Sequence, residues 1–217
     1  MKISRVRSAM TFVVALTLGT LVASQAPLLA QERLAMIPAE KMTDVQKKAV
    51  TDYKAIRGTD LTGPPWSLLL RVPDLVVPSL QIRLHYLNSS ALSPKLTEFA
   101  ILIAARQWTN NFEFNAHTPA ALKGGLKQDV VTAIAEGRRP LGLAEDEEVL
   151  YDFSMELQAN QSVSDATYAR ALAKLGEAGV VEMAGIQGYY TYLAMVMNAA
   201  RVGMPGNAAP PLQKFPR

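Results

Sequence analysis

The sequence predicts an all-α protein with one folded domain. Apolar residues recur every three to four positions along most of the chain, which is the spacing of one helix face. Glycines, prolines and capping residues separate these stretches, and no run of alternating β-branched residues indicates a strand. With 217 residues, of which 49% are hydrophobic and 19% charged, the chain is able to bury a sizeable core.

The N-terminal segment, residues 1–30, has the pattern of a secretory signal peptide. An uncharged apolar run over 10–22 follows the only three charged residues of this segment, Lys2, Arg5 and Arg7. Small residues follow this apolar run, and they are compatible with cleavage after Ala30 or after Ala26. The alternative is that the segment is not cleaved and acts as an N-terminal membrane anchor. We expect a periplasmic or secreted protein that has no membrane segment once the signal is removed.

The first helix of the mature chain is predicted over residues 44–57. Either Thr43 or Asp44 is suited to cap its start, and Gly58 is suited to end it. A rigid turn follows at Gly63-Pro64-Pro65. The next residue, Trp66, is interpreted as a core anchor.

Two more helices are predicted between the first turn and the middle of the chain. Residues 74–88 form one, in which Pro78 is tolerated because it lies in the first turn. Residues 94–108 form the other, with Ser93 as the N-cap and Pro94 at the first helical position. His85 is interpreted as a packing or surface histidine.

The C-terminal half is predicted to be helical almost throughout. Helices are expected at 112–123, 129–136, 145–159, 165–175 and 179–198. The last of these is rich in tyrosine and methionine, which we interpret as core or subunit-interface residues, and Asn198 in it needs a buried partner. The predicted organisation is a signal peptide (1–30), a helical domain (40–203) and an extended, proline-rich tail (204–217).

Charge and cysteine content exclude several function classes. The formal net charge is +3, but the part of the chain after the predicted signal has equal numbers of acidic and basic residues, so no nucleic-acid partner is expected. The chain has no cysteine, which excludes disulfides, a thiolate nucleophile and a cysteine-ligated metal. With only two histidines, we expect neither a metal nor another cofactor.

Three residues form a candidate acid–base site: Glu98, Glu113 and His117. Glu113 and His117 are four residues apart and so share one helix face. Glu98 lies on a helix that is otherwise almost wholly apolar, where a carboxylate is either paired or functional. A carboxyl group beside a neutral imidazole is suited to general acid–base catalysis. The alternative is a surface ion pair and a carboxylate that merely stabilises a helix start.

Arg106 is the candidate substrate-binding residue. It lies two turns after Glu98 and about 80° away on an ideal helical wheel. Its guanidinium is able to hold a substrate carboxylate through two parallel hydrogen bonds. The alternative, which the sequence leaves equally open, is a structural ion pair with Glu98 or Glu113.

Several motifs occur in an order that resembles the carboxymuconolactone decarboxylase-like family of the alkylhydroperoxidase-D-like superfamily. They are GPPWSLLLR at 63–71, LSPKLTEFAIL at 92–102, ExxxH at 113–117 and ALKGGL at 121–126. The region 163–205 is also similar to the C-terminal part of such proteins. The resemblance implies an all-α fold, assembly into homotrimers or hexamers, and a proton relay at Glu98, Glu113 and His117.

The resemblance also shows where this chain departs from the peroxidase branch of that superfamily. There, two cysteines occupy positions like those of Asn110 and Glu113 in this sequence. Since this chain has no cysteine, disulfide-based peroxidase or antioxidant activity is disfavoured.

Two classes of function follow. The first is a cofactor-free, lyase-type enzyme for a small carboxylic acid or lactone, acting by decarboxylation, isomerisation or lactone opening. In it His117 is the general acid or base, Glu113 orients it or relays a proton, and Glu98 completes the relay. The second is a non-catalytic, exported helical oligomer that binds a small ligand or a partner.

Overall fold

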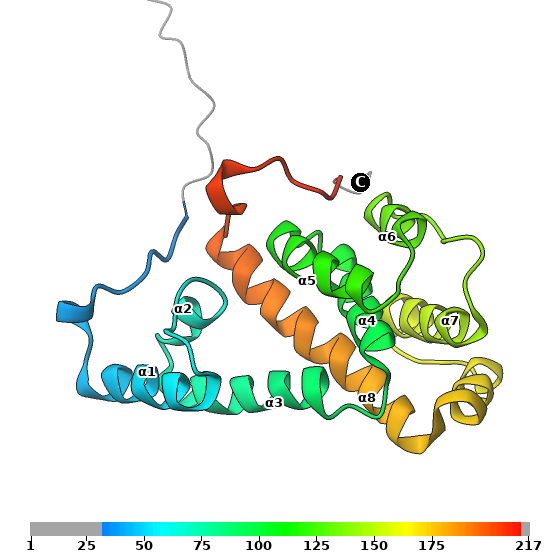
Figure 1. Ribbon diagram of the computed structural model, residues 1–217, viewed down its shortest axis with the longest axis horizontal. Coiled ribbons are helices and arrows are strands. Elements are labelled where there is room, and N and C mark those ends of the chain that lie inside the picture. The colour runs from blue at the N-terminus through cyan, green and yellow to red at the C-terminus, as the bar shows by residue number, and fades with distance from the viewer. Residues whose placement is uncertain (1–31, 214–217) are drawn as a thin grey trace, which may run out of the picture. The chain divides into compact units, whose positions relative to one another are not determined.

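The computed structural model describes residues 32–213, and this part of the chain contains eight α-helices, three short 3-10 helices and no strand. The predicted all-α class is therefore confirmed. The predicted signal peptide (1–30) and the last residues of the predicted tail (214–217) lie outside the described residues. The α-helices, shown in Figure 1, are α1 (Asp44–Arg57), α2 (Trp66–Leu69), α3 (Val76–Asn88), α4 (Pro94–Gln107), α5 (Asn111–Lys123), α6 (Gln128–Ala135), α7 (Glu145–Asn160) and α8 (Asp165–Ala200).

Local capping residues define the helix ends that the sequence predicted best. The Thr43 side chain accepts a hydrogen bond from the backbone N–H of Gln46, and Gly58 ends α1 in the left-handed conformation. At α4 the Ser93 side chain accepts from the backbone N–H of Leu96, and Pro94 occupies the first helical position. These interactions satisfy backbone groups that a helix end otherwise leaves without partners.

The centre of the helical unit is α4. Residues 96–106 are all buried, because α4 contacts α3, α5, α6, α7 and α8 (Figure 1). A helix that is apolar on every side needs such complete cover. Only two charged residues lie in this buried stretch, Glu98 and Arg106.

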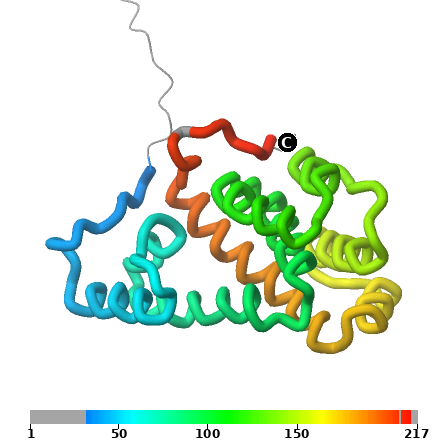
Figure 2. Tube along the Cα trace, viewed as in Figure 1, coloured from blue at the N-terminus to red at the C-terminus, as the bar shows by residue number. Residues whose placement is uncertain are grey.

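One element differs from the expected arrangement. Two separate helices were expected at 165–175 and 179–198, and the element α8 does consist of two helical parts, which meet at the non-helical Gly176 without a loop between them. Gly176 has φ 71° and ψ 175°, a conformation that favours glycine because it lacks a Cβ atom. The change of direction is visible in Figure 2, and the longer part after the kink supplies the residues that face α4.

The chain after α8 is extended except for the 3-10 helix Pro205–Asn207. Leu212 is buried, and its backbone N–H donates to the side-chain oxygen of Asn111 at 2.8 Å. The segment is therefore attached to the first turn of α5. None of the helices in the described part of the chain is both long and apolar enough to span a membrane.

Candidate functional site

The packing of α4 against α5 brings the three predicted acid–base residues to one place. Glu98 comes from the second turn of α4, and Glu113 and His117 lie one turn apart on α5. The start of α5 is fixed by Asn110, whose side-chain oxygen accepts from the backbone N–H of Glu113 at 2.8 Å. This N-cap sets the first turn of α5 and hence the direction of both functional side chains.

Glu98 and His117 form a direct, mostly buried pair. Oε2 of Glu98 lies 2.7 Å from Nδ1 of His117, and the two side chains are 10% and 12% exposed. An ionised carboxylate only accepts hydrogen bonds, so when Glu98 is ionised Nδ1 carries the shared proton, and Nε2 of a neutral ring then has a free lone pair. Glu98 thus orients His117 as a base, in the way that a carboxylate orients the histidine of a catalytic triad.

Glu113 lies in a more buried position than Glu98 and, among the described residues, lacks a histidine partner. It is 3% exposed, and burial raises the pKa of its carboxyl well above its usual value. Within residues 32–213 its Oε2 atom has no hydrogen-bond partner. Burial therefore favours the protonated, neutral form of the Glu113 carboxyl.

A cavity of about 120 Å³ joins Glu113 to His117. Its walls are mostly apolar, and its titratable side chains come from three helices: Arg83 from α3, Glu113 and His117 from α5, and Tyr190 from α8. The lining includes Trp66, Arg83, Phe112, Tyr190, Leu193 and Met197. A small, largely apolar cavity with a few convergent polar groups is the usual form of a small-molecule site.

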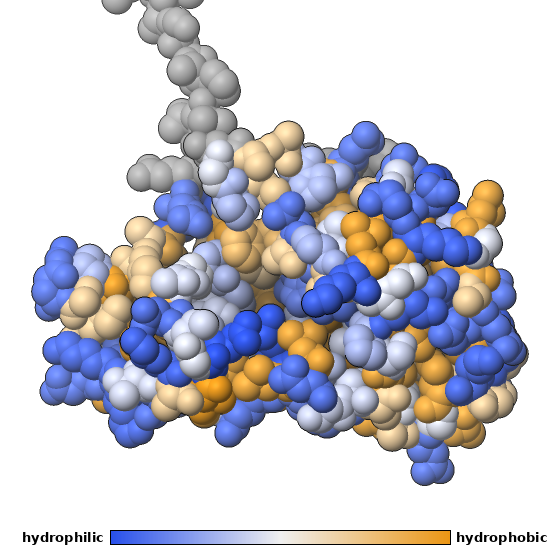
Figure 3. All heavy atoms as spheres, in the orientation of Figure 1, coloured by the Kyte–Doolittle hydropathy of each residue, from blue (hydrophilic) through white to orange (hydrophobic). Residues whose placement is uncertain are grey.

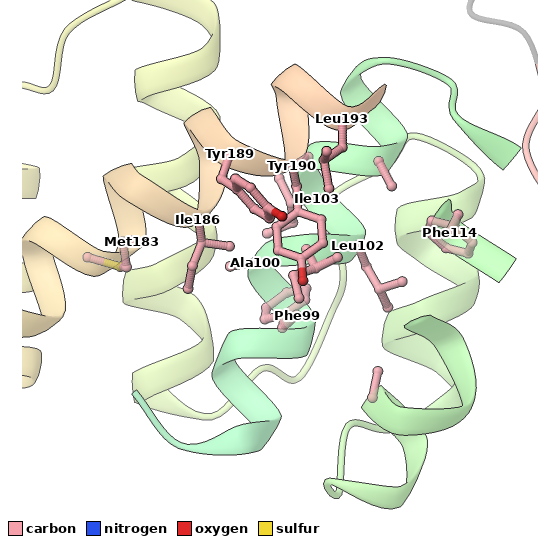
Figure 4. Close-up of a cluster of buried hydrophobic side chains, with 14 of the residues drawn as sticks. Phe99, Ala100, Leu102, Ile103, Phe114, Met183, Ile186, Tyr189, Tyr190 and Leu193 are labelled. Atoms are coloured by element: carbon pink, nitrogen blue, oxygen red, sulfur yellow. The ribbon is translucent and has the colours of Figure 1, made fainter. Parts of the chain in front are cut away.

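Tyr190 is the aromatic wall beside the histidine. Its ring meets the His117 ring edge-on, with the ring centroids 5.2 Å apart and the planes at 85°. Figure 4 shows Tyr190 projecting from α8 into the same buried cluster as Phe99 and Leu102. Burial raises the pKa of its hydroxyl well above the usual value, and the hydroxyl has no hydrogen-bond partner in the described part of the chain.

The N-cap residue Asn110 also connects α5 to α8. Its Nδ2 donates to the backbone oxygen of Ala194 at 3.3 Å and to Oδ1 of Asn198 at 3.0 Å. Asn198 in turn donates to the backbone oxygen of Trp108 at 2.7 Å. The partner that the sequence required for Asn198 is therefore Asn110, and this link holds α8 against the start of α5.

Arg106 is not part of this cavity. Its Nη1 donates to the backbone oxygen of Gln213 at 2.7 Å, and it lines a separate cavity of about 140 Å³ with Ile103, Tyr151 and Arg138. It pairs with neither Glu98 nor Glu113 through any ion pair among residues 32–213. The structure thus brings Glu98, Glu113 and His117 together and places Arg106 against α6 and α7.

Two residues of the cavity had no functional role in the sequence interpretation. Tyr190 was part of a tyrosine- and methionine-rich stretch that was read as core, and its burial agrees with that reading. No sequence pattern around Arg83 indicated a function; it was only part of the predicted helix that contains His85. His85 itself lies outside the cavity, where its Nε2 is 2.7 Å from Oε1 of Glu182.

No group of three or more histidine, aspartate or glutamate side chains in residues 32–213 is arranged to hold a metal ion. Comparison with known proteins finds no match to a protein-family model, a curated protein or a solved structure. The geometry of the cavity and the motif resemblance are therefore the basis for assigning a function.

Proposed function

We propose that the protein is a cofactor-free acid–base enzyme with a carboxymuconolactone decarboxylase-like fold. Its substrate is a small carboxylic acid or lactone, and its reaction is a decarboxylation, an isomerisation or a lactone opening. One observation carries this proposal. The same small cavity contains a histidine that is hydrogen-bonded to a carboxylate and a second carboxyl group whose pKa is raised by burial.

The base of the proposed reaction is His117. Its Nδ1–H is held by Glu98, which leaves Nε2 to take a proton from a substrate carbon or from water. The negative charge of Glu98 stabilises the imidazolium that forms. The bond between Glu98 and His117 therefore fixes both the tautomer and the orientation of the ring.

The acid is Glu113. In an isomerisation, Nε2 of His117 removes one proton and Glu113 donates another to the neighbouring carbon or oxygen, so the substrate gains and loses one proton. In a decarboxylation, the electron pair left by departing CO₂ accepts the proton of Glu113, and solvent protonates Glu113 again. Two titratable groups in environments that favour opposite protonation states are the usual basis of such a division of roles.

The proposal also includes export and self-assembly into a trimer or hexamer. Several large apolar side chains are exposed, among them Val181 (71%) and Met195 (48%) on α8. Figure 3 shows hydrophobic residues lying at the surface between hydrophilic ones. Exposed apolar groups of this size are suited to contacts between subunits.

The test is product analysis with a panel of lactones and β-keto acids, followed by single and double substitutions. His117→Ala, Glu98→Gln and Glu113→Gln should each lower turnover by roughly 10²- to 10⁴-fold. The double variants should lose little more, because parts of one relay act as a unit. Glu177→Gln is a matched control, since Glu177 is exposed on α8 and outside the cavity. Small, additive losses in the three single variants would contradict the relay.

A further inference from the structure

The cavity contains one positive charge. Among the described residues that line it, Arg83 is the only lysine or arginine. Glu98 does not line the cavity, and the one carboxyl group that does, Glu113, has its pKa raised by burial, which favours its neutral form. No ion pair between Arg83 and an acidic side chain is formed among residues 32–213. The charge is therefore available to an anionic ligand.

The position of Arg83 is set by the contact between α3 and α8. The hydroxyl of Tyr189 donates to the backbone oxygen of Ser79 at 2.7 Å, in a buried position. Ser79 and Arg83 are four residues apart, so they lie on the same face of α3. The Tyr189 ring meets the Tyr190 ring edge-on at a centroid distance of 5.2 Å. The hydrogen bond that anchors α3 thus lies one helical turn from Arg83 and beside Tyr190.

Two of the residues that line the cavity each have a buried polar atom without a partner in the described part of the chain: the hydroxyl of Tyr190 and Oε2 of Glu113. Tyr190 is 1% exposed. Buried polar groups normally have hydrogen-bond partners, and a group left without one is destabilising. Both groups have a proton to donate, so the partner they favour is a hydrogen-bond acceptor. The guanidinium of Arg83 likewise donates hydrogen bonds and cannot accept them, so it also favours an acceptor.

We propose that Arg83 and Tyr190 bind the carboxylate of the substrate, and that this pair selects small carboxylic acids over uncharged lactones. This inference rests on the proposed function and narrows its substrate class. The guanidinium fork of Arg83 matches the two oxygens of a carboxylate, and the Tyr190 hydroxyl supplies a further donor. The role that the sequence interpretation gave to Arg106 thus belongs to Arg83.

The rest of the cavity limits the size of the substrate. Trp66, Phe112 and Leu193 form apolar walls around about 120 Å³. An apolar protein cavity of about 150 Å³ holds benzene, so this volume suits a body of roughly four to six heavy atoms. With its carboxylate at Arg83 and Tyr190, such a body places its neighbouring carbons beside His117 and Glu113. The preferred ligand is therefore a short-chain or small-ring monocarboxylate.

The experiment measures equilibrium binding by NMR titration, with butyrate as the probe and butyramide as its uncharged isostere. The wild-type protein should bind butyrate at least about tenfold more tightly than butyramide. Arg83→Gln should weaken butyrate binding by about tenfold or more and leave butyramide binding within about twofold. Arg57→Gln is the matched control, because Arg57 is exposed at the end of α1, and it should change neither.

A second variant covers the case in which Arg83→Gln does not fold. Tyr190→Phe keeps the ring and its packing, and it should weaken butyrate binding by roughly three- to tenfold through loss of one hydroxyl donor. Equal binding of butyrate and butyramide by the wild type, absence of butyrate binding at millimolar concentrations, or unchanged butyrate affinity in either variant would overturn the proposal.

Binding is measured without turnover, so the two proposals are tested separately. Glu98→Gln should retain butyrate binding while losing activity, because it removes no group of the carboxylate site. If the relay variants keep full turnover but Arg83→Gln still loses butyrate, the proposed chemistry fails and the carboxylate site stands. If turnover of a small carboxylic acid depends on His117 and is unaffected by Arg83→Gln, the chemistry stands and the carboxylate site fails.

Discussion

The neutral carboxyl of Glu113 should make the stability of the protein depend on pH, and Glu113→Gln should remove that dependence. In the unfolded chain the carboxyl loses its proton near its usual pKa of 4.5, whereas burial in the folded protein raises that pKa well above this value. Between the two pKa values the folded state binds one more proton than the unfolded state. The stabilisation is complete below the unfolded pKa and is lost as the pH rises through the folded pKa.

The magnitude follows from proton linkage. Between the two pKa values the free energy of unfolding of the wild type should fall by about 1.4 kcal/mol for each pH unit because of this group. Glutamine has nearly the same volume and no proton to lose, so the variant lacks this slope. Its amide leaves a buried donor that costs about 1–3 kcal/mol, but this offset does not change with pH. Over two pH units the variant should gain about 2.7 kcal/mol relative to the wild type.

The assay is urea denaturation, followed by circular dichroism, of both proteins between about pH 5 and pH 8. The difference in free energy of unfolding between variant and wild type should increase with pH and level off once the pH passes the folded pKa of Glu113. Glu177→Gln, an exposed position on α8, is the control and should give a difference that is flat across the series. A flat difference for Glu113→Gln as well would refute the reasoning, because it would mean that Glu113 is ionised in the folded protein.

Three other outcomes are expected. Asn110→Ala removes the N-cap of α5 and two side-chain hydrogen bonds to α8, so it should lower the free energy of unfolding by about 2 kcal/mol or more in urea denaturation. The metal-free protein should not reduce alkyl hydroperoxides with a dithiol donor, because the chain has no cysteine, and turnover in that assay would overturn this expectation. Light scattering at micromolar concentration should show a trimer or hexamer, and a monomer alone would count against the proposed assembly.

The helix boundaries were predictable from the sequence because their causes are local. Thr43, Gly58 and Ser93 act on backbone groups within a few residues, and each has the role that its residue type predicts. The break at Gly176 was also predicted, but the way in which the two helical parts of α8 join was not. A glycine between two helical patterns is compatible with a loop or with a bend, and the packing of α8 on α4 and α7 decides between them.

The pairing inside the site was only partly predictable. Helical spacing places Glu113 and His117 on one face, but the hydrogen bond of His117 goes to Glu98 on the neighbouring helix. The angle of about 80° between Glu98 and Arg106 on an ideal wheel is compatible with two different neighbours. In the structure Glu98 contacts His117 on α5, whereas Arg106 lies against α6 and α7.

Arg83 and Tyr190 illustrate what periodicity does not provide. They lie on α3 and α8, more than one hundred residues apart in sequence, and reach the same cavity only through tertiary packing. Nothing close to either residue in the sequence indicates a site. A pattern within one helix predicts which side is buried but not which distant side chain it meets.

The attachment of the C-terminal segment has a practical consequence for fusion proteins. Leu212 is hydrogen-bonded to Asn111, and Gln213 accepts from Arg106, so both contacts lie within five residues of the chain end. A reporter protein joined directly after Gln213 would lie beside the first turn of the helix that carries Glu113 and His117. A flexible glycine- and serine-rich linker is therefore needed there. Activity that returns when the linker is lengthened would identify crowding at Leu212, rather than damage to the acid–base residues, as the cause of a poorly active fusion.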